Sequence, residues 1–513
     1  MYYKLSMFIA YLLAMLAIGI YFFRKNKSGG EKDYFLGGRN MNGLVAAFSA
    51  GASDMSAWVL MGLPGAIFIL GLGQIWISIG LLIGTILAWV FVAPRLRRFA
   101  IKADDSITIP EFLTKRFKTA NPTMRIASAI IFMVGYCLYT ASSIVACGDV
   151  FIAIIPSAKD YKVVVEIIAA VVIVSYTLLG GFNAVCWTDF FQGMLMLVAL
   201  MFVPIIAYIL LSVNGPVAGA VIITPDSYYD MFAGTTTWES IALVLTGLGW
   251  GLGYFGMPHI LVRYMSIKSE KEMKRSQVIG CVWIAIILLM SALVALIAHE
   301  YLGSTVSAGD KSLVFIRLVD QIFDHGALAL VGGLFLAAII AASMSTADSQ
   351  LLASSSAFSS DIYKTAIKKS ASDKELLWVG RIAVGVILII SVLIALFGGQ
   401  DIMSLVSAAW SIFGAAFGPV VLLSLFWKRF NYIGACSGII SGFVVSILWM
   451  ILFNFEYYGF TSVIVNTNLY EIIPGFIVGI IVSVVVSLLT KEPSKEVVKL
   501  FESVGESVEE VNA

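Results

Sequence analysis

Charged side chains are scarce in this chain of 513 residues: only 13% are Asp, Glu, Lys or Arg, whereas 60% are hydrophobic. Soluble proteins carry about 25% charged residues, so this composition excludes a soluble globular fold. Apolar runs of nearly membrane-spanning length recur from Ser6 to Leu489, and about 20 apolar residues in a helix cross the hydrocarbon core of a bilayer. The sequence predicts a single polytopic domain in a lipid bilayer.

The motifs of enzymes and nucleotide-binding proteins are also missing. The five cysteines show no CxxC spacing, the three histidines include no pair at metal-ligand spacing, and no GxSxG, HExxH or Walker loop is present. The net charge of +1 does not indicate a nucleic-acid partner. We therefore expect no enzymatic activity, no organic cofactor, no nucleic acid and no obligate protein partner, and we interpret the cysteines as small core residues.

Thirteen apolar segments are candidate membrane-spanning helices, which makes the expected fold class an all-α polytopic membrane protein. The candidates are 6–23, 44–69, 73–93, 124–148, 163–180, 189–213, 239–262, 277–299, 327–357, 377–397, 402–426, 433–453 and 471–490. The transmembrane domain then covers 1–490, and 491–513 is a short, helical-looking tail.

Lysine and arginine alternate between the gaps that separate these segments. If the gap after the first segment is cytoplasmic, the inner gaps and the tail hold 28 of the 33 basic residues. Loops rich in Lys and Arg stay in the cytoplasm. The N-terminus is therefore expected outside and the tail inside.

Two of the thirteen segments are interrupted by residues that disfavour helix. The second contains Ser49–Ser56 at mid-depth and then Pro64-Gly65, and the seventh contains five glycines between Gly247 and Gly256, followed by Pro258. Irregular backbone at membrane depth is tolerated only where protein or a water-filled cavity surrounds it. Paired breaks at corresponding places in two halves indicate the central site of a transporter, although close helix crossings also use glycine.

Polar side chains accompany these breaks. Asp54 lies in the second segment, where inserting a carboxylate into the bilayer costs about 2.5–3.5 kcal/mol. Asp54 either takes part in the transport cycle or only accepts hydrogen bonds from the backbone N–H groups freed at the break. In the ninth segment the hydroxyls of Ser345, Thr346 and Ser349 lie within about one turn. With backbone carbonyls near Ala52 they offer the oxygen ligands that a hard cation needs, or they serve only helix packing.

Three further polar residues are given structural roles. Asp189 is expected to cap the first turn of the sixth segment. His259 and Arg263 lie near the inner end of the seventh segment, where we expect an interfacial position.

At these residues the sequence resembles the sodium:solute symporter family, and most closely its bacterial sodium/proline symporters. The matching stretches are Leu36–Arg39, Ser49–Ser56, Met61–Gly65, Gly180–Asp189, Gly249–Gly256, Pro258-His259, Ala341–Thr346 and Leu469–Gly475. The resemblance implies a LeuT-like, five-plus-five inverted-repeat core, about 44–213 and 239–426. One peripheral helix precedes it (6–23) and two follow it (433–453 and 471–490). It also implies a bacterial cytoplasmic membrane.

The resemblance also implies residue roles. By the family's pattern, the sodium site falls on Ala52, Met55, Ala342, Ser345 and Thr346. Asp54 and Ser56 match positions for coupling, and Tyr139, Trp250, Tyr254 and Pro258 match positions for proline. A second cation site in some relatives would use Asp189, Ser345, Asp348 and Ser349 here. Two departures lie beside the substrate positions: Ala57, where many proline symporters have Gly, and Met257, where many have Gln.

The expected function is therefore import of a small amino acid, most simply L-proline, driven by sodium through alternating access. Two alternatives stay open at this point. One is a sodium symporter for another small solute, such as a different amino acid or a carboxylate, and the other is a membrane sensor that binds a solute without moving it.

Overall fold

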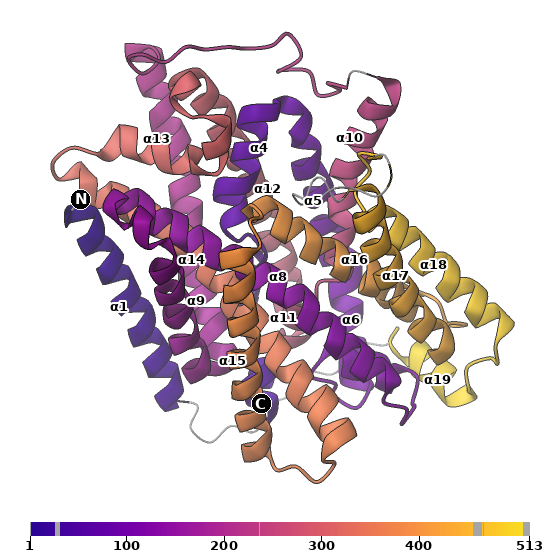
Figure 1. Cartoon of the computed structure of the whole chain (residues 1–513). Helices are drawn as coiled ribbons and strands as arrows, with labels where there is room; N and C mark the ends of the chain where they lie inside the picture. Colours follow the sequence, from indigo (N-terminus) through magenta and orange to yellow (C-terminus); the bar gives the residue numbers. More distant parts are fainter. Residues whose placement is uncertain (1, 26–30, 235, 455–463, 465, 506–513) are drawn as a thin grey trace.

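The computed structural model describes residues 2–25, 31–234, 236–454, 464 and 466–505. These residues form a bundle of helices, and their only strand-like pairing is an isolated bridge between Met41 and Ile267. The first helix begins at one end of the bundle, and the last helix lies at the other end (Figure 1). The all-α prediction is confirmed for this part of the chain.

Nineteen α-helices are present among the described residues. They are α1 (Tyr2–Lys25), α2 (Glu31–Leu36), α3 (Gly43–Asp54), α4 (Leu63–Leu70), α5 (Ile75–Leu87), α6 (Ala93–Lys102), α7 (Ile109–Arg116), α8 (Thr123–Ile154), α9 (Lys162–Asn214), α10 (Thr237–Gly249), α11 (Pro258–Ser266), α12 (Glu270–Leu302), α13 (Val314–Phe323), α14 (Leu328–Ser356), α15 (Asp373–Phe397), α16 (Ile402–Phe426), α17 (Tyr432–Phe453), α18 (Ile472–Leu489) and α19 (Lys495–Ser503).

Nine helical stretches of the described chain are long and apolar enough to cross a membrane, and two bent helix pairs raise this number to eleven. The two remaining predicted spans, 6–23 and 163–180, fall on α1 and on the first half of α9. α9 changes direction at Gly181, whose φ of 62° and ψ of −170° are not helical. The number of thirteen membrane-spanning segments therefore remains a prediction, although each of the thirteen predicted segments contains helix.

The first bent pair is α3 and α4, which meet at an angle of 59°. Helix α3 ends at Asp54, because Met55 takes φ −79° and ψ 71° and the amide of Ser56 bonds back to the carbonyl of Asp54 at 2.9 Å. A π-helical turn, Trp58–Gly62, then leads into α4. The predicted interruption of the second segment is thus a true break.

The second bent pair is α10 and α11, which meet at 46°. Here a 3-10 turn, Trp250–Phe255, is followed by Met257 in extended conformation. Pro258 explains both features, since proline forces the preceding residue out of helical conformation and is tolerated at the first position of a new helix. A Cβ on Gly253 would overlap the indole of Trp410, so this turn needs glycine where it packs on α16.

Three helices, α8, α14 and α16, are the most buried of the apolar helices. Helix α8 packs against both α14 and α16, and these two helices contact the broken segments. By contrast, α15, α17 and α18 present most of their length outward. The polar groups of α14 and the aromatic groups of α16 are therefore placed next to the two breaks, in the interior of the bundle.

Candidate functional site

The two breaks meet at Asp54. Its carboxylate is fully buried, and Oδ2 accepts a hydrogen bond of 2.5 Å from the hydroxyl of Tyr254, which lies in the 3-10 turn between α10 and α11. The second carboxylate oxygen, Oδ1, has no hydrogen-bond partner among the described residues. Burying a charged oxygen without a partner is costly, so Oδ1 leaves a hydrogen-bonding position of Asp54 unfilled among the described residues.

The backbone carbonyl of Asp54 is held from three directions. It accepts hydrogen bonds from the Tyr139 hydroxyl at 3.1 Å, from Trp58 Nε1 at 3.1 Å and from the Ser56 amide at 2.9 Å. Because the helix ends here, this carbonyl has lost its helical partner, and buried carbonyls are satisfied by other donors. Tyr139 of α8 thus fixes the shape of the first break.

The hydroxyls of α14 reach the first break as the sequence predicts. Ser345 Oγ donates to the Ala52 carbonyl at 2.8 Å, and Thr346 Oγ1 lies 3.4 Å from the same oxygen. Ser345 Oγ is also 3.0 Å from the Ala342 carbonyl. All these residues are buried, and so is Met55, which follows directly at the break. The structure therefore brings together a set of neutral oxygens, the kind of ligand that a hard cation prefers.

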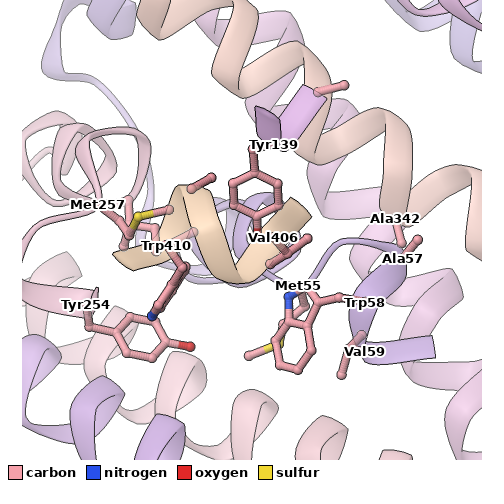
Figure 2. Packing of buried hydrophobic residues seen from close by; sticks show 14 of the residues in the cluster. Met55, Ala57, Trp58, Val59, Tyr139, Tyr254, Met257, Ala342, Val406 and Trp410 are labelled. Atoms are coloured by element: carbon pink, nitrogen blue, oxygen red, sulfur yellow. The ribbon is translucent and has the colours of Figure 1, made fainter. Parts of the chain in front are cut away.

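An aromatic wall lines the other side of the breaks. Trp250 packs on Trp58 with ring centroids 6.1 Å apart and stacks on Tyr470 at 5.1 Å, and the rings of Tyr254 and Trp410 meet edge to face at 5.3 Å. Trp410 Nε1 donates to the Trp250 carbonyl at 2.7 Å. Figure 2 shows the side chains of Trp410 and Tyr254 beside the residues of the first break. Pro258 begins α11 just beyond this wall.

A cavity of about 500 Å³ reaches this aromatic wall. Its lining includes Trp250 and Tyr470, together with Glu239 at the predicted outer end of the seventh segment, and Lys311 and Asp401, which lie in gaps predicted to be extracellular. On the opposite side of the breaks, a cavity of about 20 Å³ is lined by His259, Arg263 and Ser349, among others. That space holds about one water molecule. The site is therefore approached from the predicted outer side and closed by side chains on the predicted inner side.

Arg263 lies in the middle of the bundle, and our expectation of an interfacial position is wrong. Its guanidinium donates to Asp189 Oδ2 at 2.8 Å, to Ser49 Oγ at 2.7 Å, to Ser349 Oγ at 2.5 Å and to the carbonyl of His259 at 2.7 Å. His259 and Arg263 are only 1% and 2% exposed. One charged group thus joins α3, α9, α11 and α14.

The expected capping role of Asp189 is also wrong. The helical stretch that contains Asp189 begins at Gly181, more than one turn earlier. Its carboxylate instead accepts from Ser49 Oγ at 2.6 Å and pairs with Arg263. Among the residues of the second candidate cation site, Asp189 and Ser349 are bound to Arg263, Asp348 lies 3.2 Å from Ser349, and Ser345 faces Ala52.

Sequence reasoning missed Arg263, Trp58, Trp410 and Tyr470 as neighbours of the site. A signal existed for Trp410, since tryptophan prefers the membrane interface and this one lies in the middle of an apolar segment. The cysteines follow the expectation in part: Cys137, Cys147 and Cys186 are buried, whereas Cys281 and Cys436 are partly exposed, and all five are free thiols.

Comparison with known proteins identifies the family. The family model of the sodium:solute symporter family matches residues 34–442. The chain belongs to this family. It is 42% identical over 469 residues to the osmoregulated proline transporter OpuE of Bacillus subtilis (91% of each chain). It is also 42% identical over 465 residues to the high-affinity proline transporter PutP of the same organism (90% of this chain, 93% of PutP). Identity to sodium/proline symporter 2 of Staphylococcus saprophyticus is 40% over 476 residues (92% and 90%).

Solved structures of transporters share the fold. A Na⁺-coupled sialic acid symporter in a substrate-bound outward-open state matches with a TM-score of 0.73 at 21% identity, over 96% of this chain and 99% of that one. Mhp1, a nucleobase-cation-symport-1 family transporter, matches in a closed conformation with a TM-score of 0.51 at 12% identity (91% and 98%). The chain therefore has the LeuT-like fold of sodium symporters.

Proposed function

We propose that this symporter imports L-proline together with sodium at the junction of the two broken helix pairs. The observation that carries the proposal is the buried hydrogen bond from Tyr254 to Asp54, which joins the breaks, beside the α14 hydroxyls that face the Ala52 carbonyl. Broken helices that meet near mid-membrane form the substrate and ion sites of secondary transporters. Proline is proposed as the substrate because the relatives OpuE and PutP are named as proline transporters.

Sodium is assigned to Ala52, Met55, Ala342, Ser345 and Thr346. A hydroxyl that now donates to a carbonyl can turn its lone pairs toward a cation, so Ser345 and Thr346 exchange one bond for another when sodium enters. The helix break frees the carbonyls of Ala52 and Met55 for the ion, and Ala342 adds a carbonyl of α14 that lies 3.0 Å from Ser345 Oγ. Uncharged oxygen ligands suit a transported ion, which must bind tightly enough to be taken up and weakly enough to be released.

Proline is assigned to Tyr139, Trp250, Tyr254 and Pro258. Its pyrrolidine ring is a small apolar group that aromatic walls accommodate, and its secondary ammonium is attracted to ring faces. Its carboxylate can be received by the backbone amides at the start of a half-helix. Asp54, whose Oδ1 lacks a partner among the described residues, can accept a hydrogen bond from the ammonium or help to hold the cation.

Coupling follows from the shared backbone of the first break. Sodium between Ala52 and α14 orders the segment through Ser56, and this segment also carries the carbonyl that Tyr139 and Trp58 hold. The ion thus shapes the proline pocket, and by linkage proline must raise sodium affinity by the same factor. We assign Asp54 and Ser56 to this coupling step.

The driving force is sufficient without nucleotide hydrolysis. One sodium ion moving down about 100 mV supplies roughly 2.3 kcal/mol, and a tenfold concentration gradient adds about 1.4 kcal/mol. The sum of about 3.7 kcal/mol sustains roughly a 500-fold gradient of a zwitterion at one-to-one stoichiometry.

A second sodium ion at Asp189, Ser345, Asp348 and Ser349 would have to share two of these residues with Arg263. The variant Asp348→Ala tests this site. If a second ion binds there, the variant lowers the sodium affinity and the Hill slope of uptake. Unchanged values would remove the second site.

The proposed setting is the bacterial plasma membrane, with the N-terminus outside and the tail inside, so that the larger cavity faces the external medium. This orientation rests on the distribution of Lys and Arg.

Uptake of labelled proline into proteoliposomes, with and without an inward sodium gradient, tests substrate and coupling ion together. We expect gradient-dependent accumulation that unlabelled proline abolishes and that other amino acids and carboxylates reduce only weakly. If another solute competes better, the substrate is wrong while the symport is retained. If bound label never exchanges in counterflow, the protein binds without transporting.

A further inference from the structure

The tail that follows α18 forms an amphipathic helix, α19, on the predicted inner face. Its apolar residues Val497, Leu500 and Phe501, together with Val504 directly after the helix, follow the spacing of one helix face. Val497 and Val504 are only 4% and 1% exposed, and Ser494 caps the helix by accepting from the Val497 amide. Helix α19 is therefore docked on the bundle through a continuous apolar face.

Phe501 lies between two arginines of the inner face. The guanidinium of Arg95, on α6, is 5.0 Å from the centre of its ring, and that of Arg116, on α7, is 5.1 Å away. The ring of Phe99 meets Phe501 edge to face at 6.1 Å. Contacts of this kind between arginine and aromatic faces are attractive, and more so when water is excluded.

Arg116 is unusual among the residues that contact Phe501. Its side chain is fully buried, and neither Nη atom has a hydrogen-bond partner in the described part of the chain. Its surroundings are the rings of Phe99, Phe117 and Phe501. Burial, and then the nearby charge of Arg95, lower the pKa of Arg116 to about 9. The aromatic faces replace the missing acceptors, and one of the three belongs to the tail.

The same two arginines hold the inner end of α16. Arg116 Nε donates to the Ser424 carbonyl at 3.1 Å, and Arg95 Nε donates to the Leu425 carbonyl. These carbonyls lie in the last turn of α16, where cationic donors are favourable. Helix α16 also carries Trp410, which holds the Trp250 carbonyl in the aromatic wall. Phe501 is thus connected to the site through a single helix, α16, which contains Pro419 between Trp410 and Ser424.

The end of α19 is tied to α6 as well. Lys102 donates to the Ser503 carbonyl, and Arg98 lies 3.5 Å from the Val504 carbonyl. In the described part of the chain, the acidic residues of α19 make only long, exposed ion pairs, Glu496 with Lys118 at 3.7 Å and Glu502 with Lys428 at 4.0 Å, and such pairs contribute little. Docking therefore depends on Phe501, the buried valines and the bonds to the helix end.

We propose that the surface formed by Arg95, Arg98, Phe99, Lys102 and Arg116 is a receptor for α19, and that docked α19 restrains the inner face from opening. The occupant is this chain's own tail helix. By joining the inner ends of α6, α7 and α16, it stabilises the conformation in which the inner side is packed and the outer cavity is open. The consequence for transport rests on the alternating-access function proposed above.

Accessibility of the inner cavity tests the restraint without using any substrate. Ser356, which lines that cavity, is replaced by cysteine in a background whose five native cysteines are replaced by serine or alanine, and its maleimide labelling rate is measured in inside-out vesicles. We expect Phe501→Ala to raise that rate by about tenfold, which corresponds to about 1.4 kcal/mol of lost restraint. Lys499→Ala is the matched control, because Lys499 is an exposed residue of the same helix, and it should leave the rate unchanged.

A second measurement removes the tail helix from the chain and adds it back as a separate peptide. A variant that ends at Thr490 should show the raised labelling rate, and a synthetic peptide of residues 491–505 should lower it again, whereas the same peptide with Phe501→Ala should not. Equal labelling in wild type, Phe501→Ala and the truncated chain would overturn the proposal, as would equal effects of the two peptides. Because labelling requires no proline, failure of the tail proposal is distinguishable from failure of the substrate assignment.

Discussion

Arg263 and Asp189 form a fully buried ion pair, with 2.8 Å between Nη2 and Oδ2, just inside the proposed sodium site. The guanidinium also bonds Ser49, three residues before Ala52, and Ser349, one turn after Ser345. Arg263 therefore fixes the distance between the two elements that would hold sodium, α3 and α14.

Replacing Arg263 should destabilise the protein and weaken sodium binding. Arg263→Gln leaves Asp189 buried without its counter-charge, and the loss of one member of such a pair costs about 3–5 kcal/mol. The double variant Arg263→Gln with Asp189→Asn removes both charges and should recover much of that loss. Thermal unfolding of the purified variants measures this recovery. A double variant no more stable than Arg263→Gln would show that the ion pair is not what Arg263 contributes.

The α14 hydroxyls should determine sodium affinity rather than stability. Ser345→Ala or Thr346→Ala removes one oxygen from the proposed site, and the loss of a bond to a charged group, about 1.5–3 kcal/mol, should raise the half-saturating sodium concentration by roughly 10- to 150-fold. Sodium-dependent uptake at saturating proline measures the shift.

Ser343→Ala provides the matched control for these variants. Ser343 is buried in the same helix, and its hydroxyl donates to the Ile339 carbonyl of its own helix and lies beside the thiol of Cys147, rather than facing the Ala52 carbonyl. We expect its sodium dependence to equal that of wild type. A similar shift in all three variants would mean that helix packing, not ion coordination, explains the effect.

The positions of the breaks could be predicted from the sequence because they depend on local chemistry. Serine, glycine and proline at mid-depth disfavour helix whatever surrounds them, so the interruptions near Met55 and before Pro258 followed from residue type alone. The facing of Ser345 toward Ala52 was also predictable, since few partners exist for a freed carbonyl inside a bilayer.

The partner of Arg263 could not be predicted in the same way. An arginine near the end of an apolar segment usually reaches the interface, and only the folding of α9 at Gly181 brings Asp189 against α11. The position of Trp410 inside an apolar segment marks it as unusual, but its partner could not be predicted. Its contact with Gly253 links segments more than 150 residues apart, and one sequence does not indicate which residue it contacts.

The orientation of the chain predicts which positions reagents can reach in intact cells. Lys311 lines the larger cavity and pairs with Asp401 at 2.9 Å, whereas Lys499 is exposed on α19 at the opposite end. In a background without native cysteines, a membrane-impermeant maleimide should label Lys311→Cys in whole cells and label Lys499→Cys only after the membrane is opened. The reverse pattern would invert the proposed topology.

Asp54 offers the most direct test of coupling, because Asp54→Asn keeps the shape of the side chain and removes its charge. Tyr254 can still donate to the remaining carbonyl oxygen, so the breaks stay joined, while the second oxygen becomes an NH₂ group that repels a cation or an ammonium. We expect sodium-driven proline uptake to fall by roughly 10- to 150-fold, the factor that corresponds to losing a bond with a charged group.

Tyr254→Phe separates the contributions of the Tyr254–Asp54 hydrogen bond to sodium binding and to proline binding. It leaves the Asp54 charge but removes the donor to Oδ2, so one more buried carboxylate oxygen lacks a partner. Sodium binding should persist, because the cation is attracted by the retained charge, whereas proline affinity should fall because the wall that Tyr254 forms is no longer fixed to the first break. Calorimetric titration of sodium, and of proline at saturating sodium, distinguishes the effects. If Asp54→Asn binds both ligands like wild type, Asp54 only supports the broken backbone and takes no part in coupling.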